Sequence, residues 1–138
     1  MIQQGQCNIF KVNLLKGVEN FNTGSPYVYK LALFTANANL GPDTTAYTST
    51  GEVTGGGYTA TGHVLVPTPP ASSGTTAYVT FANVTWPAGA ITARAGLIYN
   101  ATTGAAVAVL DFGSDKTASP FTVTFPAATY TTAVLRLA

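Results

Sequence analysis

The side chains with the greatest capacity for chemistry are few, and two acidic ones stand close together in the last third of the chain. Asp111-Phe112-Gly113 spells the metal-binding triplet of protein kinases, but the companion catalytic loop and strand lysine are missing and the chain is too short for that fold. Asp111 and Asp115, with Asp43 if it lies nearby, would give a calcium ion few of the roughly six to eight oxygen ligands it takes. A strand end at which Asp111 accepts backbone N–H bonds accounts for the same residues. We therefore expect no metal and no cofactor.

Nucleophilic and hydrolytic chemistry is poorly supplied as well. His63 is the only histidine and so the only base for a Ser-His-Asp arrangement, and it opens a strand, where an ordinary imidazole is common. Cys7 is the only cysteine, which excludes an intrachain disulfide and favours a buried, inert thiol. Sugar hydrolysis would need two carboxylates flanking a groove, and the chain has five acidic residues in all. We expect no catalytic residue and no enzyme.

The glycine run at 55–57 resembles a phosphate cradle only superficially, because it lacks the following Lys-Ser/Thr and the helix start. Three consecutive glycines instead favour positive φ angles or a close approach of two backbone segments. Tyr47 and Tyr58 on either side could anchor this loop or contact a neighbouring chain.

Two charged residues stand in otherwise neutral or apolar surroundings, Glu52 and Arg94. Pairing of Arg94 with Glu52 or with Asp111 would either let the guanidinium lie half-buried or fix a contact between subunits. Together with the two tyrosines, these residues form the predicted interaction set: Tyr47, Glu52, Tyr58 and Arg94.

The composition limits the classes of partner. Only 8% of the 138 residues are charged and the formal net charge is +1, so copies of the chain repel one another weakly. The six basic residues are scattered, which argues against nucleic acid and against an anionic membrane surface. No apolar stretch is long enough for a membrane helix, and the first residues lack the pattern of a signal peptide, so we expect synthesis in a cytoplasm.

The elements that must position these side chains begin with one short helix. Residues 8–20 place Phe10, Leu14, Leu15 and Val18 on a single apolar stripe, which predicts a helix over about residues 8–18. Asn8 could cap its start, and Gly17 could mark its end. Such a helix is marginal alone, so its stripe must dock, most simply on the edge or end of a sheet.

From residue 27 onward the apolar period changes to two, which indicates strands. Turn signals at 86–89, 100–104, 113–115 and 125–126 separate several of them, and 100–104 is typical of a hairpin tip. Long irregular loops are expected near 36–57 and 66–76, and 67–74 in the second should be exposed. The sequence predicts one domain over 1–138: mainly β, an antiparallel β-sandwich or jelly-roll-like fold with one short N-terminal helix. The predicted strands are 27–34, 63–66, 78–86, 91–99, 105–112, 121–125 and 133–137.

Several segments, taken in order, resemble a family of small virion proteins of tailed bacteriophages. They are FKVNLLKG at 10–17, NF at 20–21, YKLALFT at 29–35, TTAY at 44–47, GEVTGGGYTA at 51–60, VTW at 84–86, ITARAGLIY at 91–99 and DFGSDK at 111–116. Their order and spacing cover most of the chain. The chain departs from the family at Thr61, where the family has glycine directly after the Tyr-Thr-Ala segment, and in the proline-rich loop at 67–74.

The resemblance implies a structural place in a virus particle, with head-decoration, head-fibre or tail roles. A compact, neutral β module suits repeated packing on a lattice, so we expect a non-enzymatic capsid decoration or cement protein that binds the assembled head. Its partners would be the major capsid protein or other virion proteins, and it would form a homo-oligomer, with a trimer matching three-fold lattice positions.

Two other functions follow from the same residues. A head- or tail-fibre module would anchor a fibre or contact the host surface, where Tyr47, Tyr58 and Asn100 could bind a sugar. A hydrolase acting on the cell envelope has weak support, because the residues that would carry it are too few.

Overall fold

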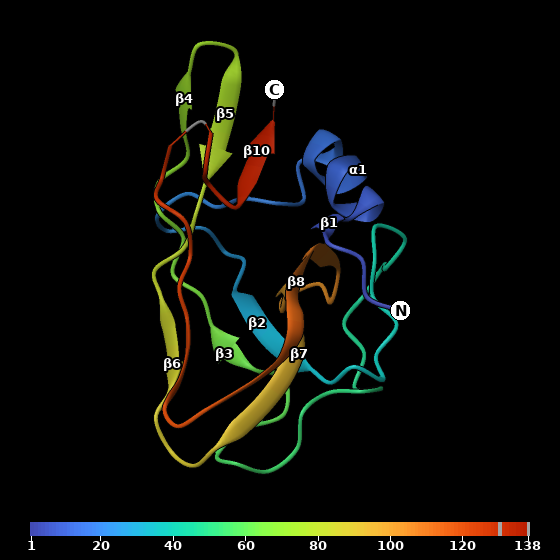
Figure 1. The fold of residues 1–138 in the computed structure, drawn as a ribbon. Helices are drawn as coiled ribbons and strands as arrows, with labels where there is room; N and C mark the ends of the chain where they lie inside the picture. Colours follow the sequence, from blue (N-terminus) through green and yellow to red (C-terminus); the bar gives the residue numbers. More distant parts are fainter. Residues whose placement is uncertain (130, 138) are drawn as a thin grey trace.

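The computed structural model describes residues 1–129 and 131–137, and these form a single small, mainly β domain with antiparallel sheets and one short helix, as predicted (Figure 1). The main sheet contains five strands in the order β1-β8-β7-β2-β3, a second sheet has the order β10-β5-β4, and β6 and β9 form a two-stranded ribbon. The jelly-roll-like arrangement stays a prediction. The elements are β1 (Gly5–Gln6), α1 (Asn8–Lys16), β2 (Tyr29–Phe34), β3 (His63–Val64), β4 (Ala71–Ser73), β5 (Thr76–Val79), β6 (Val84–Trp86), β7 (Ile91–Asn100), β8 (Ala106–Ala118), β9 (Phe121–Val123) and β10 (Leu135–Leu137).

The core lies around β2 and β7, two adjacent inner strands of the main sheet. Leu31 and Leu33 of β2 and Leu97 and Ile98 of β7 are fully buried. Consecutive residues Leu97 and Ile98 point to opposite sides of the sheet, so both faces are covered here, unlike an antiparallel sheet with one face in water. The candidate residues, which lie in the β2–β3 connection and within β7, are therefore attached to the buried centre of the sheet.

The helix ends as predicted but begins and packs differently. Gly17 has a φ of 73° and its N–H bonds back to carbonyls of the last turn, which confirms the glycine cap. Asn8 is the first helical residue, not the cap; Cys7 occupies the cap position and makes no side-chain cap bond. Leu15 does not join the buried stripe, because a turn of about 100° per residue carries it away from buried Phe10, and it is 92% exposed. In the described part of the chain, no helix is long and apolar enough to cross a membrane.

The prediction that a turn at 113–115 ends the strand is wrong, because β8 continues to Ala118. Its pairing with β7 jumps from Ala95↔Asp111 to Ala93↔Lys116, so four residues of β8 oppose the single residue Arg94. Gly113, with a φ of 85°, lies inside this bulge. The local turn signal is real, but the hydrogen bonding of β7 on either side keeps the strand going through it.

Residues 78–86, predicted as one strand, are divided between two sheets. β5 ends at Val79 and pairs with β4 and β10, whereas β6 begins at Val84 and pairs with β9. Thr80 makes the change of direction: its N–H donates to the hydroxyl of Thr68, and its own hydroxyl donates to the carbonyl of Pro126. The exposed loop at 67–74 contains β4, which forms a hairpin with β5 that rises beside β10 at the top of Figure 1.

The hairpin tip at 100–104 is confirmed. The Asn100 side-chain oxygen accepts bonds from the backbone N–H groups of Thr102 and Thr103, and Gly104 has a φ of 84°. Asn100 itself is fully buried, because the same side chain also donates into the interior. It fixes the β7–β8 connection from the inside.

Candidate functional site

A buried carboxylate organises the long connection between β2 and β3. Glu52 is 8% exposed and accepts three hydrogen bonds. The hydroxyl of Tyr47 donates to Oε1 at 2.5 Å, the hydroxyl of Tyr58 donates to Oε2 at 2.5 Å, and the backbone N–H of Thr61 donates to Oε2 at 2.9 Å. Three of the four predicted interaction residues, Tyr47, Glu52 and Tyr58, therefore contact one another. Together with Thr61, they form what we call the Glu52 cluster.

The Glu52 cluster is tied to the main sheet through its tyrosines. The hydroxyl of Tyr58 accepts a bond from the backbone N–H of Leu33 in β2, and the ring of Tyr47 stacks on Tyr99 of β7 with centroids 4.8 Å apart. Burial, reinforced by the hydrogen bonds to Glu52, raises the pKa of both tyrosine hydroxyls well above its usual range, so they remain donors. The tyrosines anchor the loop; their contact with a partner stays a prediction.

Thr61 has a backbone conformation that threonine rarely adopts. Its φ is 79°, the left-handed region in which a β-branched residue is strained. The hydroxyl of Tyr99 donates to its carbonyl at 2.6 Å, and the ammonium of Lys30 donates to its hydroxyl at 3.2 Å. With the bond to Glu52, these contacts hold Thr61 in place at the position where the resembled family has glycine.

The glycine run at 55–57 confirms a close approach of two backbone segments. All three residues have positive φ angles. A Cβ atom at Gly57 would lie 1.7 Å from the carbonyl oxygen of Ala88, and one at Gly56 would lie 2.0 Å from that of Ala90. Side chains at these two positions would push the 88–90 turn away, which explains the glycines without a phosphate.

Arg94 pairs with Asp111 and not with Glu52. The guanidinium contacts Asp111 Oδ1 across the β8 bulge, and both side chains are about a quarter exposed. The N–H of Gly113 donates to the same oxygen at 2.8 Å, so Asp111 accepts a backbone N–H bond as predicted, but inside the bulge of β8 and not at a strand end. That bond and the neighbouring guanidinium lower the pKa of Asp111 below its usual range. The pair braces the bulge from within one chain.

The remaining candidate metal-ligating and nucleophilic side chains do not lie together in one site. Within residues 1–129 and 131–137, no three His, Cys, Asp or Glu side chains lie close enough together to hold a metal ion. His63 is exposed and meets Trp86 edge-on, with ring centroids 5.8 Å apart. Cys7 is fully buried, and burial raises the pKa of its thiol to about 11, so the thiol is protonated at neutral pH.

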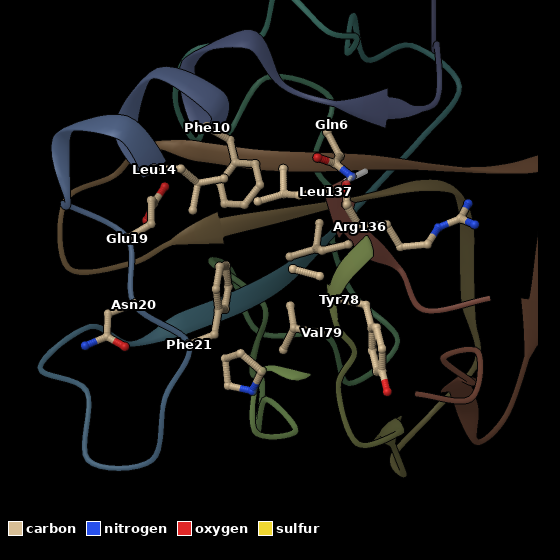
Figure 2. A pocket seen from close by; sticks show the side chains of 13 residues that line it. Gln6, Phe10, Leu14, Glu19, Asn20, Phe21, Tyr78, Val79, Arg136 and Leu137 are labelled. Carbon is tan, nitrogen blue, oxygen red and sulfur yellow. Dashed lines mark hydrogen bonds between the residues drawn. The ribbon is translucent and has the colours of Figure 1, made fainter. Parts of the chain in front are cut away.

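A pocket between α1 and the second sheet was not predicted. It has a volume of about 250 Å³ and mostly apolar walls. Figure 2 shows Phe10 and Leu14 pointing from α1 toward Phe21 and Val79 on the other side of the pocket. It is lined by Gln6, Phe10, Leu14, Glu19, Asn20, Phe21, Pro70, Ala77, Tyr78, Val79, Leu135, Arg136 and Leu137.

Glu19 is the buried charged group of this pocket. Its Oε1 accepts bonds from the hydroxyl of Tyr29 at 3.1 Å and from the side-chain amide of Asn100 at 2.8 Å. Its Oε2 is buried without a hydrogen-bond partner. Burial raises the pKa of Glu19 above its usual range, against the opposing effect of these two bonds. The criterion that selected Glu52, a charge in neutral surroundings, also fits Val18-Glu19-Asn20 and would have found it.

No protein-family model, no curated protein and no solved structure matches this chain. Three features of the described residues stand out: the closed Glu52 cluster, the ion pair that braces a strand bulge, and the apolar pocket beside α1. In the first two, the polar groups are satisfied by contacts within the chain. Of these three features, only the pocket has room for another molecule.

Proposed function

We propose that this protein is a non-enzymatic structural component of a virion, most specifically a decoration protein that binds the assembled head of a tailed bacteriophage. The observation that carries the proposal is the scarcity of charge on the surface. Of eleven charged side chains, Glu19 and Glu52 are buried, Arg94 and Asp111 pair with each other, and Lys30 is half-buried. The six exposed ones are Lys11, Lys16, Asp43, Asp115, Lys116 and Arg136.

Such a surface can pack against another protein without removing many charges from water, which is the largest electrostatic cost of association. Weak contacts of this kind become strong on a lattice, because many copies bind one shell and only the assembled state offers the sites. The ordered resemblance to small virion proteins supports the same conclusion. The chain would be made in the host cytoplasm and would bind the major capsid protein or another virion protein as a homo-oligomer, with a trimer suited to three-fold positions.

Gold-labelled antibody against this chain, applied to intact particles and viewed by electron microscopy, tests the proposal. Label spread over the whole head supports decoration, and mature heads should then bind added protein in many copies while unassembled capsid protein does not. Label at one vertex or on the tail replaces decoration with the head- or tail-fibre function. If intact and disrupted particles both stay unlabelled, the virion assignment is wrong.

A second measurement addresses the role on the particle. Particles that lack the chain should lose their DNA at lower temperature or on dilution from high salt, and adding back the purified protein should restore their resistance. Particles that assemble and keep their DNA equally well without it would contradict a cementing role, even if the protein is present on the head.

A further inference from the structure

The surface formed by α1, β10 and the pocket between them and β5 differs from the rest of the molecule; we call it the α1–β10 face. Its centre is the pocket of about 250 Å³ walled by Phe10, Leu14, Phe21 and other apolar side chains (Figure 2). An apolar cavity of roughly 150 Å³ is enough to hold a benzene ring, so this pocket has room for a large apolar side chain.

Exposed apolar side chains also lie on the two elements that flank the pocket. Of the seven large hydrophobic residues that the structure shows exposed, three belong to α1 and β10: Val12 at 45%, Leu15 at 92% and Leu137 at 47%. Leu137 lines the pocket itself, whereas Leu15, the most exposed of all seven, lies on the flank of α1, about 100° around the helix from the pocket-lining Leu14. A pocket together with exposed apolar residues beside it is the pattern of an interaction site rather than of scattered surface residues.

The charges of the same two elements have one sign. Lys11, Lys16 and Arg136 are three of the six basic residues of the chain, and all three are exposed. Neither α1 nor β10 contains an acidic residue, and the acidic residue that lines the pocket, Glu19, is 8% exposed. Two copies that met through this face would bring these cations together, whereas an acidic segment would be attracted to them.

We propose that the α1–β10 face binds an acidic segment of a different protein chain, which inserts a large apolar side chain into the pocket while its carboxylates lie near Lys11 and Arg136. This deepens the proposed function by naming the chemistry of the partner, and it rests on that function only in taking the partner to be a protein. The apolar anchor supplies the affinity, and the charges supply the orientation and the association rate.

The test uses three synthetic peptides and the isotope-labelled full chain, followed by amide chemical shifts in NMR. The probe is N-acetyl-Asp-Glu-Phe-Leu-Asp-Glu-amide; one control replaces the four acidic residues by lysine, and the other replaces Phe-Leu by Ser-Ser. The probe should shift amides of α1, β5 and β10, and each control should bind at least about fivefold more weakly. Added salt should weaken the binding of the probe and should not weaken the binding of the lysine peptide.

Two substitutions at exposed positions sharpen the test without disturbing the core. Leu15→Ser and Lys11→Glu should each weaken binding of the probe by about three- to tenfold. Their matched controls, Val66→Ser and Lys116→Glu, change a residue of the same kind at an exposed position outside the face and should leave binding unchanged. Unchanged unfolding midpoints for all four variants would show that a weaker interaction with the probe is not caused by loss of folding.

Three results would overturn the proposal: shifts that are absent or fall outside the α1–β10 face, equal binding of the acidic and lysine peptides, or a dimer in light scattering that Leu15→Ser dissolves. The last result would make a second copy the occupant. Failure of this proposal is separable from failure of the proposed function. If heads are decorated equally by the wild-type chain and Leu15→Ser, the face is wrong and decoration stands; if the peptide binds and no particle is labelled, the face stands and the virion role is wrong.

Discussion

Among the residues that the structure describes, Glu52 and Glu19 are the two buried carboxylates, both 8% exposed, and they differ in how their oxygens are hydrogen-bonded. Both oxygens of Glu52 accept hydrogen bonds, from two tyrosine hydroxyls and one backbone N–H. Only one oxygen of Glu19 does, and the other is buried without a partner. A buried polar group left unmatched costs free energy of folding, whereas a matched one stabilises the segments that supply its donors.

The difference divides the molecule into a closed region and an open one. Around Glu52, a connection without regular strands is fixed to β2 and β7 by side-chain hydrogen bonds, and no exposed large apolar residue accompanies it. Around Glu19, the packing of α1 leaves a pocket and exposed leucines. We infer that the first region is built for stability, and that the second gives up stability where a partner can bind.

The largest expected effect is that of Glu52→Ala. It removes the acceptor of three donors in a buried site, so we expect the free energy of unfolding to fall by about 3–4 kcal/mol. Urea unfolding followed by Trp86 fluorescence measures this loss. Asp115→Ala, which removes an exposed acidic side chain, is the control and should change stability little. A loss of less than about 1 kcal/mol for Glu52→Ala would show that the cluster does not hold the loop.

The two tyrosines allow a finer test of the same cluster. Tyr58→Phe leaves the ring but removes a hydroxyl that donates to Glu52 and accepts from the N–H of Leu33, and should cost about 2 kcal/mol. Tyr47→Phe removes one bond at a partly exposed position and should cost about 1 kcal/mol. Equal losses in urea unfolding would mean that the bond to β2 adds nothing beyond the bond to Glu52.

What could be predicted from the sequence depends on how local the cause is. The glycine cap at Gly17, the hairpin tip at 100–104 and the need for glycine at 55–57 follow from backbone conformations that few residues adopt, and all three are confirmed. The alternation that indicates strands is local too, and it predicted the β class. These features need no knowledge of which segments meet in space.

Apart from the cap and the exposed Leu15 of α1, the misplaced features depend on pairing between distant segments. The division of 78–86 is decided by Thr68 and Pro126, which hydrogen-bond to Thr80 from 12 and 46 residues away. The continuation of β8 through its bulge is decided by β7, and the sequence left Arg94 with two possible partners, Glu52 and Asp111. The pocket beside α1 brings together residues from both ends of the chain, so no local pattern reveals it.

Glu19→Gln tests the open region through the pH dependence of the free energy of unfolding. The pKa of Glu19 in the folded protein is raised above its ordinary value of 4.5, so the folded state holds this proton more tightly than the unfolded state. Stability from Glu19 is therefore fully present below that ordinary value and is lost as the pH rises through the raised pKa. Each tenfold difference in proton affinity between the folded and unfolded states corresponds to about 1.4 kcal/mol of this loss. Glutamine cannot ionise, so the Glu19→Gln variant does not show this pH-dependent loss of stability.

The quantity to measure is the difference in unfolding free energy between the wild type and Glu19→Gln, from urea titrations at several values between about pH 4 and about pH 8. Taking the difference removes the contributions of the other titrating groups, which both proteins share. The unfolding free energy of the variant minus that of the wild type should increase as the pH rises through the pKa of Glu19, and should then stay constant at higher pH. A difference that is flat over this range would mean that Glu19 has no raised pKa and that its unmatched oxygen is satisfied in solution.

The smallest expected effect returns to the closed region, at Thr61. Glycine adopts a φ of 79° without strain, so Thr61→Gly relieves roughly 1–2 kcal/mol of backbone strain. It also gives the unfolded chain more freedom and removes the hydroxyl that accepts a bond from Lys30, which together offset part of the gain. We expect a net stabilisation of about 0.5 kcal/mol in urea unfolding. In a Glu52→Ala background the same substitution should stabilise less, because without the bond to Glu52 the backbone of Thr61 can relax and less strain remains for glycine to relieve. An equal gain in both backgrounds would show that Glu52 plays no part in holding that strain.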